Sequence, residues 1–204
     1  AQRVISTNWQ EIFSQSQLRN LEPMRNKLVG ASYKERMELG LTEDGVTVPG
    51  GLLSSQGVED LIRELVSDAR ATRDFNDLPI PFAAVATDVL NGEIAILEEG
   101  DLADAMRASM AIPGAFAPVR LDGKILIDGG VMRNLPVDVA REQCADIVIA
   151  VRLEAPPPSA GSLISGLNIA GQTIDVVIRA NEKEQWNSLT DKDIKIVVSV
   201  GTVG

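Results

Sequence analysis

The sequence feature best suited to chemistry is Asp128-Gly129-Gly130, which follows directly on the apolar run at 125–127. A carboxylate disfavours a strand and is costly to bury, so an aspartate at this point needs a reason. In one interpretation Asp128 caps backbone amides in a tight turn, and the glycines adopt positive φ angles. In the other, Asp128 is a general base, and the glycines let its carboxylate approach a nucleophile without Cβ clashes. The local sequence favours neither decisively.

The absence of certain residue types narrows the chemistry further. Among the 204 residues there is no histidine and one cysteine, Cys144. A Ser-His-Asp triad, a Cys-His pair, and zinc sites built on imidazole or several thiolates are therefore excluded. Any reaction must use carboxylates, hydroxyls, lysines or backbone amides. We predict that Cys144 is a buried structural thiol on a helix.

Charge and motif scans exclude several function classes. Lys and Arg number 19 against 29 Asp and Glu, and the resulting net charge of −10 repels a phosphate backbone, so no nucleic-acid partner is expected. No stretch reaches the ~18 apolar residues that a membrane-spanning helix needs. P-loop, G-x-G-x-x-G, C-x-x-C and S-x-x-K motifs are all missing, which disfavours a nucleotide-binding domain.

The elements upstream of Asp128 alternate between helices and hairpins. Apolar residues at helical spacing from 58 to 69 predict a helix. Asn91-Gly92 and Asp122-Gly123 each predict a hairpin closed by a type I′ turn. Between the hairpins, Asp101 is expected to cap a helix that Pro113-Gly114 ends.

The elements downstream of Asp128 follow a βαβ pattern. Pro136 is expected to begin a short helix, and residues 146–153 form an apolar run typical of a strand covered on both faces. A long amphipathic helix at 167–189 and a final buried strand at 194–200 complete the pattern. Asp128 would then lie at the carboxyl end of a strand, where open α/β sheets bind their ligands.

Four segments, at 6–16, 51–65, 75–93 and 107–153, resemble consecutive blocks of bacterial patatin-like phospholipases. These are lipid acyl hydrolases related to plant patatin and neuropathy target esterase. The resemblance implies an α/β fold with three α/β/α layers around a mixed, mainly parallel sheet. It also implies one domain over residues 1–204 that is incomplete at its amino-terminal end.

The resemblance assigns a role to the Asp-Gly-Gly sequence. In the family this motif supplies the aspartate of a serine–aspartate dyad, which places the catalytic role on Asp128 and the motif positions on Gly129 and Gly130. Arg133 and Asn134 are expected to order the loop that carries Asp128. The implied activity is hydrolysis of lipid esters, of the phospholipase A or esterase type, with no metal or cofactor. A lipid ester substrate would be compatible with peripheral contact between the protein and a membrane.

The nucleophile expected from the resemblance is missing from this chain. Neither a G-x-S-x-G elbow nor a glycine-rich oxyanion loop occurs in it. Ser32 has Lys34 where the second elbow glycine should be, and Ser109 lies in a predicted helix, where we expect it to pack. We therefore expect a fragment, inactive alone, with apolar strands exposed where sheet neighbours are lost.

Two interpretations of the site remain. In the intact enzyme, Asp128 would lie in a partly desolvated position that raises its pKa. The pKa of the carboxyl would then be closer to the pKa of the hydroxyl that gives up its proton. The alternative is a non-catalytic module that binds lipid or protein and has lost its serine outright. Asp88, which also ends a predicted strand, is expected to cap a turn.

Overall fold

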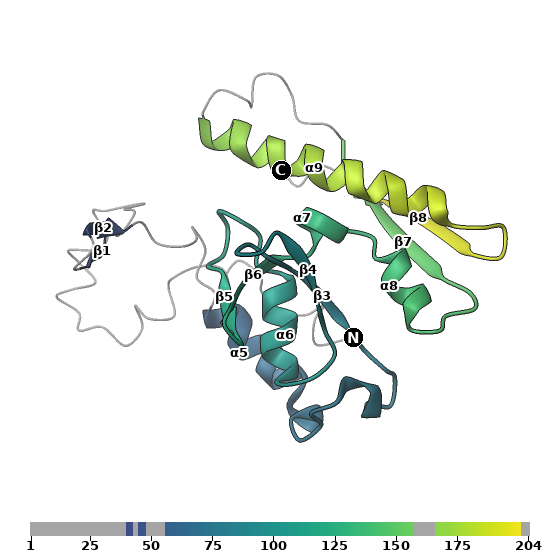
Figure 1. Cartoon of the computed structure of the whole chain (residues 1–204), viewed down its shortest axis with the longest axis horizontal. Coiled ribbons are helices and arrows are strands. Elements are labelled where there is room, and N and C mark those ends of the chain that lie inside the picture. The colour runs from purple at the N-terminus through teal and green to yellow at the C-terminus, as the bar shows by residue number, and fades with distance from the viewer. Residues whose placement is uncertain (1–39, 43–44, 48–55, 157–165, 201–204) are drawn as a thin grey trace.

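The computed structural model describes residues 40–42, 45–47, 56–156 and 166–200. A short antiparallel pair, β1 (Gly40–Thr42) and β2 (Gly45–Thr47), comes first in the chain. Most of the described residues form two parts that lie side by side (Figure 1). One is an antiparallel sheet with two helices, and the other is a parallel strand pair with a long helix. Ser32 lies outside the described residues.

The first part is a four-stranded sheet in the order β4-β3-β6-β5. Its strands are β3 (Ala84–Asp88), β4 (Glu93–Leu97), β5 (Val119–Leu121) and β6 (Lys124–Asp128). Every pairing in this sheet is antiparallel. All five residues of β3 are buried, so β3 and its neighbour β6 form the centre of this part.

The two predicted hairpins are confirmed, but only one has the predicted turn. At the β5–β6 turn, Asp122 and Gly123 have φ angles of 49° and 77°, as a type I′ turn requires. In the other hairpin Asp88 pairs with Glu93, which leaves a loop of residues 89–92 in which Gly92 has a positive φ and Asn91 does not. The Asp88 carboxylate accepts hydrogen bonds from Leu90 N and Asn91 Nδ2 at 3.1 and 2.7 Å, and the loop folds around it.

Of the two helices in this part, one packs on the sheet and the other packs on that helix, through small and apolar side chains. The helix predicted from the spacing at 58–69 is confirmed as α5 (Gln56–Leu65), continued by the 3₁₀ turn η1 (Ser67–Ala69). A second 3₁₀ turn, η2 (Phe75–Asp77), precedes β3. The helix α6 (Leu102–Ser109) begins as predicted, with the Asp101 carboxylate accepting hydrogen bonds from two backbone amides. One core cluster joins the sheet to α6 and consists of Ala86, Ala95, Ala108 and Leu126.

The second part confirms the predicted βαβ unit. After β6 come α7 (Gly130–Arg133) and α8 (Val137–Glu142), followed by β7 (Ile149–Glu154), α9 (Gly166–Ser188) and β8 (Ile194–Ser199). The strands β7 and β8 are parallel and in register from Ile149 opposite Ile194. One core cluster of this part consists of residues in or next to α8, β7 and α9: Leu135, Val137, Val148, Ala150 and Leu189.

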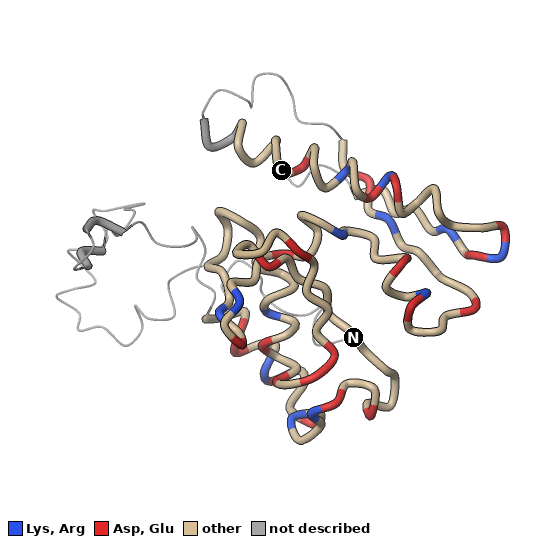
Figure 2. The backbone as a smooth tube through the Cα atoms, viewed as in Figure 1, with Lys and Arg blue, Asp and Glu red and all other residues tan. Residues whose placement is uncertain are grey.

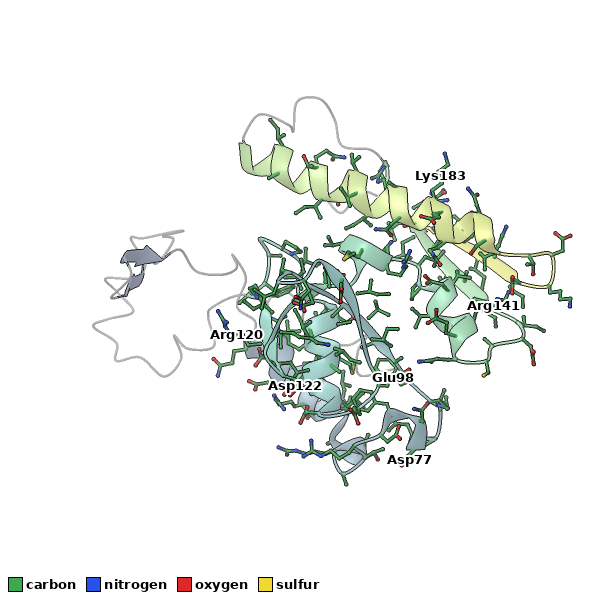
Figure 3. All side chains as sticks on the ribbon, viewed as in Figure 1. Asp77, Glu98, Arg120, Asp122, Arg141 and Lys183 are labelled. Carbon is green, nitrogen blue, oxygen red and sulfur yellow. The ribbon has the colours of Figure 1, made fainter. Side chains whose placement is uncertain are left out.

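A buried carboxylate joins β8 to the rest of this part. Asp193 accepts hydrogen bonds from Val148 N at 2.9 Å and Thr190 N at 2.7 Å. Arg141, labelled in Figure 3, donates from Nη2 to both Asp193 oxygens at 2.6 Å. These bonds, led by that from Val148, hold the pKa of Asp193 well below its usual range.

Of two predictions about the sheets, the first is not confirmed within the described residues and the second is wrong. The predicted mainly parallel sheet is not found, because parallel pairing is confined to β7 and β8. These strands were also predicted to be buried, yet Ile149 and Leu153 are 61% and 64% exposed, and all six residues of β8 are exposed. Exposed apolar strands are expected where sheet neighbours are absent from the described residues.

The prediction for Cys144 is also wrong. Its thiol is exposed rather than buried. The helix α8 ends at Glu142, and Cys144 follows in a left-handed conformation with φ of 65°. Its amide donates to the Arg141 carbonyl at 3.0 Å, which closes the end of the helix and directs the side chain outward.

Charged residues are spread over both parts (Figure 2). The signs are mixed in most elements, but between Arg73 and Arg107 every charged residue is Asp or Glu. In the described part of the chain, no helix is both long and apolar enough to cross a membrane.

The core residue of β6 gives the first prediction. Leu126 is fully buried against α6 and β3, so Leu126→Ala should lower the free energy of unfolding by about 2–5 kcal/mol through the cavity it leaves. The matched variant Leu90→Ala removes the same atoms from a loop residue that is 61% exposed, and should change stability by less than about 0.5 kcal/mol. Urea unfolding of the intact protein measures both, and equal effects would contradict the assigned core.

Candidate functional site

Asp128 is the last residue of β6, and two neighbouring elements hold its backbone. It lies opposite Ala86 of β3 in the sheet. Its amide donates to the Ala111 carbonyl, just beyond α6, at 3.0 Å. Its carbonyl accepts a hydrogen bond from the Thr87 hydroxyl at 3.0 Å. The strand end that carries the carboxylate is therefore fixed by the sheet and by the end of α6.

The Asp128 side chain makes one hydrogen bond within the described residues. Oδ1 accepts from the Gly130 amide at 2.7 Å, across a turn of two residues. No described residue donates to Oδ2. Asp128 thus caps an amide, as the turn interpretation predicted, and retains one oxygen that these contacts do not use.

The glycines are required for close packing, and the predicted positive φ angles are wrong. Gly129 has φ of −63° and ψ of −26°, which any residue adopts. A Cβ on Gly129 would lie 2.1 Å from the Val85 carbonyl oxygen of β3. A Cβ on Gly130 would lie 3.0 Å from both Asp128 Oδ1 and Asn134 Oδ1. The chain leaves β6 in contact with the β3 backbone, and only a residue without a side chain fits there.

Burial raises the pKa of the Asp128 carboxyl, although the Gly130 hydrogen bond opposes part of that effect. The direction agrees with the prediction of a partly desolvated site. A carboxylate with a raised pKa accepts a proton more readily than an exposed one. The described part of the chain contains no group of three His, Cys, Asp or Glu side chains that could hold a metal ion.

Arg133 and Asn134, which are expected to order the loop that carries Asp128, both bond to neighbouring helices. Arg133 Nε is 3.3 Å from Asp138 Oδ2, an ion pair between α7 and α8. Asn134 Nδ2 donates to Glu182 Oε2 of α9 at 2.7 Å. These two contacts order the segment after Asp128, and neither involves the Asp128 carboxylate.

Sequence reasoning missed the polar residues of α9 that hold this segment. Asn181 forms hydrogen bonds with the backbone of α7 and of the residue that follows it, Asn134. Gln185 Oε1 accepts a hydrogen bond from the Asp138 amide at 3.0 Å. Glu182 and Gln185 are both buried. Polar side chains at 181, 182 and 185 share one face of the helix. This spacing is the sequence signal that could have identified them.

The other candidates have structural roles. Asp88 caps the β3–β4 loop, as predicted. Desolvation alone would raise the pKa of Asp88, but the bonds from Asn91 and Leu90 outweigh it and leave that pKa below its ordinary value. Ser109 is the last residue of α6, and its carbonyl accepts from the Gly129 amide at 3.4 Å. That bond involves the backbone alone, and the packing role expected for the Ser109 side chain stays a prediction.

Comparison with known proteins identifies the family. A family model described as patatin-like phospholipase matches residues 4–141, which include β6, the Asp-Gly-Gly sequence and Asn134. The chain belongs to the patatin-like phospholipase family. The matched segment ends before β7, α9 and β8.

Individual relatives agree with this membership. An NTE family protein of Mycobacterium tuberculosis is 38% identical over 122 residues, or 60% of this chain and 32% of the relative. Patatin-like phospholipase domain-containing protein 7 of Mus musculus is 34% identical over 121 residues, or 56% of this chain and 9% of the relative. The patatin-like chain thus spans about a third of the mycobacterial relative's length.

The contact between Gly129 and β3 gives a second prediction. Gly129→Ala should lower the free energy of unfolding by about 3 kcal/mol or more, because neither backbone can yield without breaking sheet bonds. The matched variant Gly171→Ala lies in α9 with nothing within 4 Å of its Cβ and should stabilise by about 0.5–1 kcal/mol. Thermal unfolding distinguishes the two, and a neutral Gly129→Ala would rule out the close contact.

The raised pKa of Asp128 gives a third prediction, on stability against pH. Below its ordinary value of 3.8 the carboxyl is protonated in both folded and unfolded states, and stability is lost as the pH rises through the folded-state pKa. Asp128→Asn cannot ionise and keeps an acceptor for Gly130. Its free energy of unfolding relative to the wild type should therefore be higher at about pH 7 than at about pH 3.

The control for this experiment is Asp122→Asn, at the exposed turn on the other end of β6, where Asn suits a positive φ equally well. Its stability difference from the wild type gives the baseline for an Asp-to-Asn change at an exposed position. A pH-independent difference for Asp128→Asn would show that burial does not perturb Asp128.

Proposed function

We propose that this chain is the aspartate-bearing part of a lipid acyl hydrolase, with Asp128 as general base for a serine supplied from outside these 204 residues. The observation that carries the proposal is the partly buried carboxylate at the carboxyl end of β6, held by Gly130 through one oxygen. Family membership supports hydrolysis of lipid esters as the reaction class. The dyad itself, the single domain over residues 1–204 and the inactivity of this chain alone belong to the proposal.

The geometry suits a base better than a nucleophile. The bond from Gly130 fixes Oδ1, so that Oδ2 is the oxygen available to a hydroxyl. The backbone of Asp128 is bonded to Ala111 and Thr87, which limits its freedom to approach a carbonyl carbon. Proton transfer needs only hydrogen-bond distance, and a fixed carboxylate satisfies this with little reorganisation.

The proposed reaction is acyl transfer through a covalent intermediate. The serine oxygen attacks the ester carbonyl carbon as its proton passes to Asp128 Oδ2. The carbon–oxygen bond to the alcohol then breaks, and the alcohol leaves with that proton. A water molecule next attacks the acyl-serine, again losing its proton to Asp128, and the fatty acid is released as the proton returns to the serine. Backbone amides outside this chain would stabilise the oxyanion.

The exposed strands support a contribution from a longer protein. Ile149, Val151 and Leu153 of β7 are all at least half exposed, and a parallel pair is normally covered on both faces. We propose that residues outside this chain add strands to β7 and β8, forming the mixed three-layer sheet that the resemblance implies. Those residues would also deliver the serine near Asp128.

A substitution of Asp128 tests the proposal. In the intact protein, Asp128→Asn should lower kcat for a lipid ester by about 10²- to 10⁴-fold, because the amide cannot accept the serine proton. The KM should change little, since no binding contact is removed. Steady-state hydrolysis of a short-chain phospholipid measures both parameters.

The control is Asp122→Asn, which makes the same chemical change on the opposite end of β6 and should leave kcat unaltered. A fluorophosphonate probe should label one serine of the intact wild-type protein, which mass spectrometry locates. Full turnover by Asp128→Asn would refute the role of Asp128. Failure to label any serine would favour the non-catalytic binding module instead.

A further inference from the structure

Asn181 of α9 bonds to both ends of α7, the short helix that follows Asp128. Its Nδ2 donates to the Gly130 and Val131 carbonyls at 3.2 and 3.0 Å. Its Oδ1 accepts from the Asn134 amide at 3.1 Å. In a continuing helix the Asn134 amide would donate to the Gly130 carbonyl, four residues earlier. The Asn181 amide group takes the place of that bond and attaches α7 to α9.

Glu182 makes a second attachment next to the first. It is only 7% exposed, and its Oε2 accepts from Asn134 Nδ2 at 2.7 Å. Its Oε1 lies 2.6 Å from Arg152 Nε of β7, so the buried charge is paired. The Arg152 guanidinium also lies over the Trp186 ring, 5.6 Å from its centroid. The face of α9 that holds α7 is therefore itself fixed to β7.

The Gly130 residue connects this attachment to Asp128. Its amide donates to Asp128 Oδ1, and its carbonyl accepts from Asn181, so one buried glycine is bonded on both sides. We propose that Asn181 is a positioning residue for the Asp128 carboxylate: by fixing Gly130, it holds Oδ1 and keeps Oδ2 oriented toward the reacting hydroxyl. This inference rests on the proposed function of Asp128.

Asn181 lies outside the segment that the family model matches, so the match itself assigns this residue no role. The matched segment covers residues 4–141, whereas α9 begins at Gly166. Lys183, two residues from Asn181, projects from the outer side of α9, away from α7 (Figure 3). Asn181 and Lys183 therefore differ in what they contact while sharing the same helix, which makes Lys183 a suitable control.

The first test compares Asn181→Ala with Lys183→Ala in the intact protein. Asn181→Ala should lower kcat by about 10- to 100-fold, because a small displacement of a reacting group is costly. Its KM should stay within about 2-fold of the wild type. The acid limb of the kcat–pH profile should shift to higher pH, because a loosened Gly130 bond no longer lowers the pKa of Asp128. Lys183→Ala should match the wild type in all three.

The second test does not depend on catalysis. Carbon-13 NMR titration of labelled aspartate carboxyls, with Asp128 assigned through Asp128→Asn, should show a higher pKa for Asp128 in Asn181→Ala than in Lys183→Ala. In the wild type, hydrogen exchange at the Asn134 amide should be slow, because its proton is bonded to Asn181. The exchange measurement needs no variant and remains decisive if Asn181→Ala does not fold.

The outcomes separate this inference from the proposed function. If Asn181→Ala folds with an unchanged acid limb and an unchanged Asp128 pKa, Asn181 does not position Asp128. An unprotected Asn134 amide in the wild type would overturn the inference equally. If the wild type hydrolyses no ester, the proposed function fails, while the titration and exchange results still decide whether Asn181 controls the Asp128 carboxyl.

Discussion

The contact between Gly129 and the β3 backbone is the constraint on which the site depends. The space for a Cβ is already occupied by the Val85 carbonyl group, with its oxygen 2.1 Å away. The chain can therefore leave β6 and turn into α7 without separating from β3. Asp128 is brought to this position by the sheet, and its Oδ1 meets the Gly130 amide within two residues. A side chain at 129 would displace the strand end and the carboxylate together.

Burial of Asp128 costs folding stability and, at the same residue, favours the proton uptake that the proposed reaction needs. Burial disfavours the charged form of Asp128, and a single hydrogen bond from Gly130 offsets only part of that cost. Asp193 shows the alternative, because two backbone amides and Arg141 all bind its carboxylate. Asp193 is bonded so fully that it serves only to join β8 to α8. The sparse bonding of Asp128 is what its proposed role as a base requires.

Features set by neighbouring residues were predictable from the sequence, and those set by distant contacts were not. The Asp122-Gly123 turn and the Asp101 cap follow from local backbone chemistry, and both are confirmed. The type I′ turn predicted between β3 and β4 is wrong, because the loop folds around the Asp88 carboxylate, which accepts two hydrogen bonds from it. The prediction that β7 is buried is wrong. An apolar run indicates that a strand needs cover, but that cover must come from other segments.

The attachment of α7 to α9 shows the same limit within the site. Asn181 bonds to residues 47 to 51 positions earlier in the chain, so no local pattern in the Asp-Gly-Gly segment could indicate it. The segment that carries the motif ends at Asn134, whose side chain needs an acceptor and finds it on Glu182. Because α7 is a single turn, it has too few internal bonds to be stable alone. A carboxylate held by so short a helix can be no better ordered than the element on which that helix rests, and here that element is α9.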